Sequence, residues 1–502
     1  GEHGSQMWGK FILRRCFEAE LGELDAGART ALESYARGVN AFVNTHGDSL
    51  PVEFSLLGVG FEPWTPVDSL IFAKVQALDL TDTWANELLA SDMIQALGED
   101  ATRKLLPGYP EDGPVTVPQQ GGRSFAPDVQ AFLDVLRPLK GGWGEGLGSN
   151  NWAVAGTRSA TGNALLANDP HLGVRSPSIW YQIQMSTRDG SLDVEGFGFP
   201  GAPGIVTGHN KQIAWGVTNL GADVMDVYLE QLDPQQHPGQ YRSADGWKPL
   251  QVFTETINVR EGTPVTQTVR VTEHGPIISD AVPVTPALST TVTGTYSIRW
   301  TALEPGRLYE AVNDLQTASD WGEFRAALSK WNVPGQNFVY ADTAGNIGYQ
   351  AAGLVPVRSS GSGTLPVQGW TGEGEWTGYV PFDQMPTAYN PSEGFVATAN
   401  NRPYADGSPN AFPGYFAQPW RIERIRELLT AKDKPTLDDL RAVQLDTVSG
   451  LARRATPFFT AVQPDDARAQ QAVEQLKGWD GNMAADSVPA AIFEVTYNNV
   501  LS

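Results

Sequence analysis

The strongest constraint on the fold is a change of pattern at residue 149. Residues 1–106 read as helices, and residues 28–43 keep apolar side chains three and four positions apart. Beyond residue 149, short segments rich in β-branched and aromatic residues alternate with turns, and helical patterns return only after residue 416. This order differs from regular βαβ alternation and predicts an α+β protein with helices and strands in separate layers.

The chain divides into three predicted segments. Residues 1–106 form a helical portion, and residues 149–502 carry the strands and the last helices. Between them, residues 107–148 are rich in Gly and Pro and read as a tether with one short apolar helix rather than as core. The chain begins without Met and stops inside an apolar run, so we interpret it as a fragment of a longer precursor.

Composition narrows the class of protein. The net charge of −22 argues against a nucleic-acid partner, because a phosphate backbone attracts basic surfaces. The single cysteine, Cys16, excludes an intrachain disulfide and a zinc–thiolate site. The sequence holds no run of about 18 apolar residues, so no membrane-spanning helix is expected. Phosphate-binding, dinucleotide-binding, HExxH and GxSxG motifs are all missing, so no organic cofactor is expected.

The chemistry is expected at Ser149, within the stretch GEGLGSNNWAVAGTRSATGNALLANDPHL. A nucleophile elbow would place a serine between a strand and a helix, whereas Ser149 lies between a glycine-rich tether and a strand. If the Gly148–Ser149 bond is cut, Ser149 gains an α-amine with a pKa of about 7.7–8 that can activate its own hydroxyl. From these residues alone, a plain junction between a loop and a strand is the preferred interpretation, and the N-terminal nucleophile is the alternative.

Several motifs in the same order resemble the penicillin acylase family of N-terminal nucleophile hydrolases. The stretch from Ser149 to Leu172 is similar to the start of its β-chain, and SYARGVNAFV and WTPVDSLIFAKVQAL are similar to its α-chain. The resemblance implies a four-layer αββα sandwich, self-cleavage before Ser149, release of a spacer, and an αβ heterodimer that is periplasmic or secreted. The other similar stretches are PGIVTGHNKQIAWGVTNLGADVMDVYLE (203–230), NFVYADTAGNIGYQAAGLVPVR (337–358), GFVATANNRP (394–403) and PWRIERIRELL (419–429).

Catalytic roles also follow from the resemblance. Ser149 would be the nucleophile and, through its α-amine, the base. The backbone N–H of Asn219 and the side chain of Asn337 would stabilise the oxyanion. His171 would hold the serine and help move protons, and Arg358 would orient the catalytic asparagine. The alternatives are an asparagine that satisfies a turn, a histidine that caps its own turn, and a solvated arginine.

The resemblance further implies a structural Ca²⁺ site. Glu87, Asp223 and Asp226 would supply carboxylates and Met225 its carbonyl, which are the hard oxygen ligands that Ca²⁺ requires. A solvated acidic turn is the alternative.

The acyl pocket is expected to depart from the phenylacetyl-selective members of the family, which place aromatic rings around it. The matching positions here are Leu172, Thr207, Ala77 and Thr81. These smaller side chains predict room for a longer or bulkier acyl group on a small-molecule N-acyl amide such as a β-lactam or an acyl-homoserine lactone.

Two other functions remain open on the sequence. The chain has 15 tryptophans and a strand-rich body, which also suit a non-catalytic secreted protein that binds carbohydrate or another ligand. A glycosidase with paired carboxylates is the third possibility.

Overall fold

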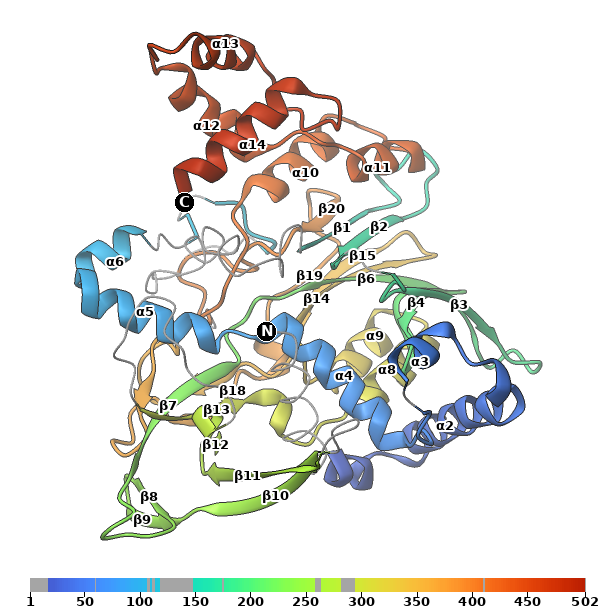
Figure 1. The fold of residues 1–502 in the computed structure, drawn as a ribbon. Coiled ribbons are helices and arrows are strands. Elements are labelled where there is room, and N and C mark those ends of the chain that lie inside the picture. The colour runs from blue at the N-terminus through green and yellow to red at the C-terminus, as the bar shows by residue number, and fades with distance from the viewer. Residues whose placement is uncertain are drawn as a thin grey trace.

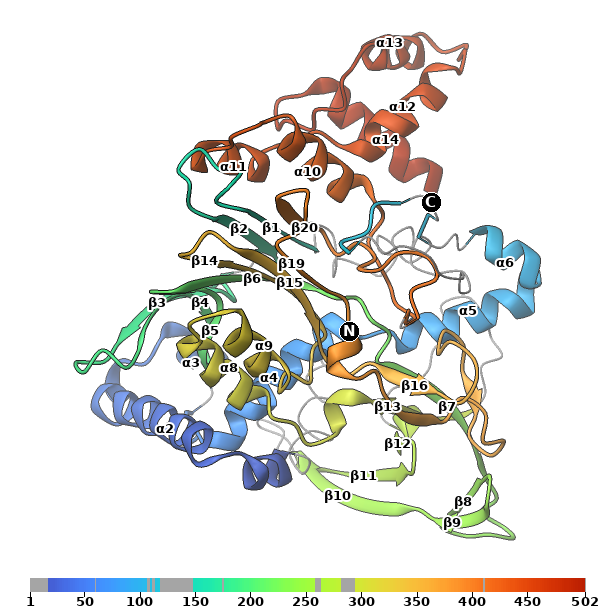
Figure 2. The ribbon, with the colours of Figure 1, turned by 180° about the vertical axis from the view of Figure 1, so that it is seen from behind.

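Four layers of secondary structure make up the centre of the molecule (Figures 1 and 2). The structure is a computed structural model that describes residues 17–58, 60–105, 109–110, 113–117, 148–173, 176–257, 263–280, 294–409 and 411–501. Two sheets lie face to face, and helices cover the outer face of each sheet. The predicted α+β class and the four-layer αββα sandwich are therefore confirmed.

A seven-stranded antiparallel sheet, in the order β19-β15-β14-β6-β5-β4-β3, is the larger inner layer. Its central strands are almost wholly buried, because the other sheet covers one face and helices cover the other. A tight turn at 342–346 joins β14 to β15: Asp342 accepts a 2.9 Å hydrogen bond from the Asn346 N–H, and Gly345 has a φ of +87°, which favours glycine. The strands are β3 (Tyr181–Ser186), β4 (Asp193–Phe199), β5 (Ala202–Asn210), β6 (Ile213–Asn219), β14 (Gln336–Asp342), β15 (Ile347–Ala352) and β19 (Thr387–Tyr389).

A three-stranded sheet, in the order β2-β1-β20, is the second inner layer. It comprises β1 (Gly148–Val154), β2 (Leu165–His171) and β20 (Phe395–Thr398). Side chains alternate along β1, so Trp152 packs with the C-terminal helices while Ala153 packs with the seven-stranded sheet. Ser149 has the same parity as Ala153 and therefore also faces the space between the sheets.

Helices form the two outer layers. The C-terminal layer holds α10 (Trp420–Thr430) and α11 (Leu437–Gln444), which contact β20 and β2. The opposite layer holds α8 (Leu308–Thr317), α9 (Trp321–Leu328) and, beside β5, α4 (Pro66–Thr81). The prediction that helical patterns return only after residue 416 is therefore wrong, because α8 and α9 lie within the strand-rich part of the chain. The stretch WTPVDSLIFAKVQAL (64–78), within the portion predicted to be helical, forms most of α4, and Thr65 and Asp68 form a capping box at its start.

The remaining elements flank this sandwich. A five-stranded sheet (β13-β7-β8-β9, with β17 beside β7), a three-stranded sheet (β10-β11-β12) and the β16–β18 pair lie at one end. The helices are α2 (Ala26–His46), α3 (Val52–Leu57), α5 (Trp84–Leu97), α6 (Glu99–Leu105), α12 (Gly450–Thr460), α13 (Ala467–Leu476) and α14 (Val488–Leu501). The strands are β7 (Met225–Leu232), β8 (Gln240–Ser243), β9 (Gly246–Pro249), β10 (Gln251–Ile257), β11 (Val265–Thr272), β12 (Gly275–Pro276), β13 (Thr295–Trp300), β16 (Pro356–Arg358), β17 (Val367–Gln368) and β18 (Trp376–Tyr379).

The tether predicted over residues 107–148 is wrong for its first part. Tyr109 is only 6% exposed and belongs to the main apolar core. The Val117 N–H donates to the carbonyl of Pro403 at 3.0 Å, and Val117 bridges to Tyr404. Residues 109–110 and 113–117 are therefore docked on the segment after β20, while the short apolar helix expected further on lies outside the described residues.

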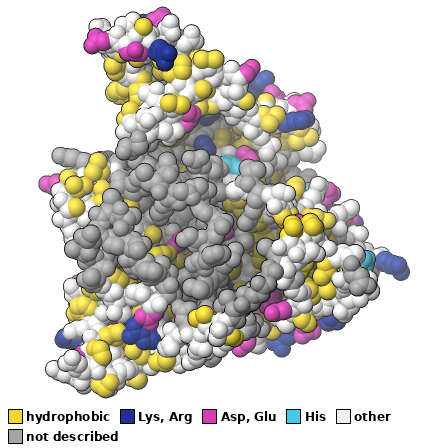
Figure 3. All heavy atoms as spheres, in the orientation of Figure 1, with side chains coloured by type: hydrophobic (Ala, Val, Ile, Leu, Met, Phe, Trp, Pro, Cys, Tyr) yellow, Lys and Arg dark blue, Asp and Glu magenta, His cyan; other side chains and the backbone are white. Residues whose placement is uncertain are grey.

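In the part of the chain that the structure describes, no helix is both long enough and apolar enough to cross a membrane. On the face drawn in Figure 3, basic and acidic side chains are interspersed over the coloured surface rather than segregated by sign.

Candidate active site

Ser149 lies at the start of β1, between the two sheets, and is only 6% exposed. Its backbone N–H donates to Asn400 Oδ1 at 2.8 Å. The Asn400 amide also donates to the Asn219 carbonyl at 2.9 Å, so one side chain holds both the nitrogen of Ser149 and the end of β6. This nitrogen is the atom that cleavage after Gly148 would free.

His171 lies opposite Gly148 in the antiparallel pairing of β1 with β2. Its Nδ1 is 2.9 Å from the Asp169 carbonyl and 3.5 Å from Asp169 Oδ1, so Nδ1 carries the proton if it donates to either oxygen. A Cβ on Gly148 would lie 2.7 Å from Nε2, which places Nε2 beside the Gly148–Ser149 bond. The ring therefore caps its own turn through Nδ1 and leaves Nε2 facing the predicted cleavage site.

Asp169 orients the imidazole ring of His171. Burial opposes its ionisation, but hydrogen bonds from His171 and Asn150 outweigh burial and lower the pKa of Asp169. The Asn150 amide donates to Asp169 Oδ2 at 3.1 Å. An ionised Asp169 favours the His171 tautomer with its proton on Nδ1, which leaves Nε2 able to accept a proton.

Asn219 and Asn337 lie on adjacent strands at the edge of this site. Asn219 lines the same cavity as Ser149, and its side chain donates to the Leu80 carbonyl at 2.9 Å. Asn337 is fully buried; its amide donates to Thr218 Oγ1 at 3.1 Å and to the Asn219 carbonyl at 3.0 Å. Both amide hydrogens of Asn337 are thus engaged, so donation to an oxyanion would require it to exchange one of these partners. The oxyanion roles of both residues stay predictions.

The prediction for Arg358 is wrong in its geometry. The hydroxyl of Tyr349, not Arg358, donates to Asn337 Oδ1, at 2.5 Å. Arg358 instead donates to both carboxylate oxygens of Asp226, at 2.6 and 2.7 Å, and pairs with Asp223 at 3.2 Å. A buried guanidinium takes the nearest carboxylates, because their charges offset its desolvation. Arg358 therefore belongs with the predicted calcium ligands.

The predicted calcium ligands form a buried acidic cluster. Burial, followed by repulsion from Asp226 and Asp223, raises the pKa of Glu87 well above its usual value, and burial also raises that of Asp223. Arg358 offsets one of the three charges. Glu87 Oε1 and Asp223 Oδ1 are buried without a hydrogen-bond donor, while Asp223 Oδ2 pairs with Arg358 at 3.2 Å.

These oxygens suit a hard divalent cation in their chemistry. However, in the described residues no group of three or more His, Cys, Asp or Glu side chains is arranged to hold a metal ion. Arg358 binds both carboxylate oxygens of Asp226. Glu87 Oε1 and Asp223 Oδ1 are therefore the buried oxygens that a cation would satisfy. The residues therefore fit a cation in donor type, and calcium stays a prediction.

An apolar cavity of about 90 Å³ opens beside Ser149. Leu172 lines it as predicted, but Ala77, Thr81 and Thr207 do not. On α4 the lining residues are Ala73, Gln76 and Leu80, which share one face of the helix, whereas Ala77 and Thr81 lie on the next face and pack into the protein. The correct helix was predicted with the wrong rotation.

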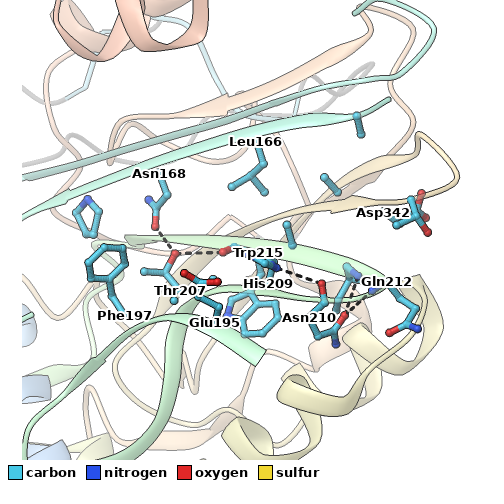
Figure 4. Close-up of a pocket in the computed structure, with 18 of the residues that line it drawn as sticks. Leu166, Asn168, Glu195, Phe197, Thr207, His209, Asn210, Gln212, Trp215 and Asp342 are labelled. Atoms are coloured by element: carbon cyan, nitrogen blue, oxygen red, sulfur yellow. Dashed lines mark hydrogen bonds between the residues drawn. The ribbon is translucent and has the colours of Figure 1, made fainter. Parts of the chain in front are cut away.

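Thr207 fails for the corresponding reason in a strand. Successive side chains of β5 point to opposite faces, so Val206 lines the cavity beside Ser149 and Thr207 faces the other way. Figure 4 shows the Thr207 hydroxyl directed at Asn168, 2.7 Å away, in a separate groove of about 810 Å³ between the sheets.

The predicted smaller walls are also corrected by four aromatic rings that the sequence reasoning missed. Trp180, Phe199, Tyr309 and Trp331 refill the space beside Ser149, and the first two rings lie 4.4 Å apart between centroids. These residues come from two stretches of the chain, 180–199 and 309–331, that are far apart, so no local pattern points to the cavity. Asn400 is different, because it lies within the quoted motif GFVATANNRP, and attention to that motif would have found it.

The fold and the site define a class of protein. An αββα sandwich with a serine at the start of an inner strand, a glycine before it and an apolar cavity beside it is the architecture of the N-terminal nucleophile hydrolases. The family model described as "Penicillin amidase" matches residues 6–502. The chain therefore belongs to the penicillin amidase family.

Curated relatives and a solved structure agree. The chain is 32% identical over 498 residues to penicillin acylase 2 proenzyme of Pseudomonas sp. (strain SE83), covering 96% of this chain and 61% of that protein. It is 28% identical to acyl-homoserine lactone acylase QuiP of Pseudomonas aeruginosa, covering 96% and 59%. The thermostable penicillin G acylase of Alcaligenes faecalis aligns with a TM-score of 0.56 and 27% identity, over 66% of this chain and 59% of that one. The chain thus spans about three fifths of the length of these proteins.

Proposed function

We propose that this protein hydrolyses an N-acyl amide through an acyl-serine at Ser149, after cutting its own Gly148–Ser149 bond. The observation that carries the proposal is the position of Ser149, which lines an apolar cavity with Asn219 while its nitrogen is held by Asn400 and His171 faces the preceding residue. A serine in a plain loop-to-strand junction needs none of these neighbours.

In the maturation step, Ser149 Oγ attacks the Gly148 carbonyl carbon and the C–N bond breaks, which leaves an ester and a free α-amine. Water then hydrolyses the ester and gives Gly148 a carboxylate and Ser149 its hydroxyl. His171 Nε2 lies beside this bond and can accept the hydroxyl proton. Before the cut the Ser149 nitrogen is an amide and cannot act as a base.

In the proposed turnover, the α-amine accepts the Ser149 proton while Oγ attacks the substrate carbonyl. The oxyanion forms near Asn219, and the leaving amine takes the proton as the C–N bond breaks. Water hydrolyses the acyl-serine by the same route in reverse. The net reaction consumes one water and yields one carboxylic acid and one amine.

The two chains are expected to stay together as an αβ heterodimer. The segment before the cut contributes Ala73, Gln76 and Leu80 to the acyl cavity, and Leu80 accepts a hydrogen bond from Asn219. The buried Lys74–Glu20 pair and the Lys74 bond to the Ala302 carbonyl also tie this segment inside the sandwich. Dissociation would expose this core to water.

We infer an acyl group of modest size. A cavity of about 90 Å³ is of the order of the apolar cavities that bind a single benzene ring. Its aromatic walls favour a phenylacetyl-sized or short aliphatic acyl group, in place of the longer chain that the sequence predicted. The names of the relatives supply two amine classes to test, β-lactam and homoserine lactone.

Calcium is proposed as a structural ion held by Glu87, Asp223, Asp226 and the Met225 carbonyl. When bound, it would neutralise buried carboxylates and so stabilise the join of α5 to β7. Thermal unfolding in the presence of Ca²⁺, of Mg²⁺ and of a chelator tests this, with Glu87→Gln as the altered ligand. A melting temperature that Ca²⁺ leaves unchanged would contradict it.

Export to the periplasm or beyond is proposed from the resemblance, and fractionation of producing cells tests it.

A denaturing gel of the purified protein tests the central proposal. Two chains are expected, the larger beginning Ser-Asn-Asn-Trp, together with hydrolysis of phenylacetyl p-nitroanilide faster than that of decanoyl p-nitroanilide. Ser149→Ala should remain one chain and be inactive. A single intact wild-type chain without activity would favour a binding protein, and activity in Ser149→Ala would refute the serine mechanism.

A further inference from the structure

Asn400 has an unusual backbone for a residue with a side chain. Its φ of +62° lies in the left-handed region, which asparagine tolerates better than most residues. The conformation turns its side chain toward β1, where Oδ1 accepts from the Ser149 N–H at 2.8 Å and Nδ2 donates to the Asn219 carbonyl at 2.9 Å. Strain of this kind is retained where the surrounding structure requires the resulting geometry.

Arg421 holds Asn400 from the C-terminal layer. It lies in the first turn of α10, and its Nη2 donates to Asn400 Oδ1 at 3.0 Å. Its Nη1 donates to the Ser149 carbonyl at 2.8 Å and to Asn150 Oδ1 at 2.7 Å. One guanidinium therefore fixes the residue that binds the Ser149 nitrogen and also the carbonyl on the other side of Ser149.

The same guanidinium reaches His171 through a second branch. Asn150 accepts from Arg421 and donates to Asp169 Oδ2 at 3.1 Å. Asp169 in turn holds the ring of His171. The ideal Cβ of Gly148 would also lie 3.2 Å from Arg421 Nη2 and 2.7 Å from His171 Nε2, so both branches close around the bond before Ser149.

We propose that Arg421 and Asn400 are positioning residues that align the Ser149 nitrogen with His171, and that the charge of Arg421 keeps the freed α-amine in its basic form. The inference rests on the proposed function of Ser149. It adds a reason why an α-amine in a buried site stays available as a base.

The electrostatic part follows from the shared acceptor. The Ser149 nitrogen and Arg421 Nη2 both bind Asn400 Oδ1, at 2.8 and 3.0 Å, so the two nitrogens lie within about 6 Å of each other. A like charge at this separation disfavours the protonated amine. Asn400 Oδ1 accepts from a neutral amine as well as from an ammonium, but its oxygen is already shared with the guanidinium. The negative charge of Asp169 acts in the opposite sense, but Asp169 reaches Arg421 only through Asn150, whereas the guanidinium shares an acceptor with the Ser149 nitrogen. The charge of Arg421 therefore decides the direction.

The experiment compares Arg421→Met and Arg421→Lys with the wild-type protein. The readout is the pH dependence of kcat/KM, normalised to the amount of cleaved chain. In Arg421→Met the acidic limb is expected to move to higher pH by about one unit, because the amine is no longer held neutral. In Arg421→Lys the limb should stay near the wild-type position while the rate falls, because one ammonium cannot make the same three bonds.

Arg424→Met is the matched control. Arg424 lies on the same helix, and its guanidinium pairs with Asp446 and Glu427, away from Ser149. The control loses one positive charge, as Arg421→Met does, but it loses that charge away from Ser149. Its pH profile should therefore match that of the wild type. An acidic limb that stays in place in Arg421→Met, or that moves equally in Arg424→Met, would overturn the electrostatic part.

Asn400→Gly tests the positioning role of Asn400. This test stands even if Arg421→Met does not fold. Glycine keeps the left-handed backbone at no steric cost and removes only the side chain. We expect kcat to fall at least tenfold with KM little changed, because the side chain of Asn400 does not line the acyl cavity. An unchanged kcat would overturn the inference. Failure of the proposed function is separate, since it would appear in the wild-type protein as an uncut chain or in Ser149→Ala as retained activity.

Discussion

Gly148→Ala separates maturation from turnover. A Cβ on Gly148 would lie 2.7 Å from His171 Nε2 and 3.2 Å from Arg421 Nη2. Ordinary contact begins at 3.4 Å, so the imidazole must retreat by about 0.7 Å from the bond that is to be cut. Overpacking of this kind costs about 1–3 kcal/mol. If that cost falls on the geometry of proton transfer, self-cleavage slows by roughly 5- to 150-fold, since 1.4 kcal/mol is a factor of ten.

The activity of the cleaved enzyme should nevertheless be normal. After the cut, residue 148 is no longer attached to Ser149, so the added methyl group has left the site. The assay is a time course of freshly made protein on a denaturing gel, followed by hydrolysis of phenylacetyl p-nitroanilide per mole of free N-terminal serine. We expect a slower gain of the larger chain and an unchanged specific rate.

Gly173→Ala is the matched control, because a Cβ at Gly173 meets nothing within 4 Å. It lies two residues beyond His171 on the same strand exit and should cleave at the wild-type rate. Cleavage of Gly148→Ala at the wild-type rate would refute the position assigned to His171. A cleaved Gly148→Ala enzyme with a reduced specific rate would refute the view that residue 148 acts only before maturation.

Three further predictions concern parts of the molecule outside the cleavage step. Val206→Ala should change the ratio of kcat/KM for decanoyl over phenylacetyl substrates upward by about tenfold, whereas Thr207→Ser, on the other face of β5, should leave the ratio unchanged. Mass spectrometry of the smaller chain should find Val117 retained, because its N–H is bonded to Pro403; a chain that ends before it would contradict the docked segment. Burial lowers the pKa of His274, but hydrogen bonds to Glu230 and Glu375 outweigh burial and raise the pKa from 6.5 to about 9. The resulting stabilisation, about 3 kcal/mol, is full below pH 6.5 and is lost as pH rises through 9, so urea unfolding at pH 6 and pH 10 should differ by this amount in the wild type and not in His274→Gln.

Local signals in the sequence were sufficient for some elements of the fold, but not for α8 and α9, which lie where only strands were expected. The capping box at Thr65 and Asp68 and the hairpin turn at 342–346 lie within a few residues of their partners, so composition and order determine them. The position of Ser149 at the start of an inner strand followed in the same way from the change of pattern around it. The four-layer order was implied by the family resemblance, because the order of helices and strands alone predicts only that the two lie in separate layers.

The sequence first left open which face of each helix or strand meets the cavity. Ala77 and Thr207 were assigned to the acyl pocket on the correct helix and strand, yet each lies one position from a lining residue, Gln76 and Val206. A shift of one residue turns a side chain by about 100° on a helix and to the opposite face on a strand. Which face meets a cavity depends on the neighbouring layer, which is specified elsewhere in the chain.

Long-range polar contacts were the second feature that the sequence left open. Arg421 is 272 residues from Ser149, and Asn400 is 251 residues from it, so no spacing rule relates them. The misplaced role of Arg358 has the same origin, because its 132-residue separation from Asp226 hides the ion pair that fixes it. Buried charges take the partners that best offset desolvation, and those partners are known only once the layers are stacked.

If the chain cuts itself as proposed, the arrangement around residue 148 lets one set of side chains act in both the uncut and the cut protein. Asn400 accepts from the Ser149 nitrogen, and either an amide N–H or an amine N–H can supply that bond, so the acceptor need not move when the bond is cut. Arg421 binds the Ser149 carbonyl, which lies on the side of the serine that is retained. Only the Gly148 side changes, where Gly148 lies opposite His171 in the strand pairing and a side chain would contact His171 Nε2. A site whose polar side-chain contacts lie on the retained side can exchange its own peptide for a substrate amide without rebuilding those contacts, which is what a nucleophile generated by self-cleavage requires.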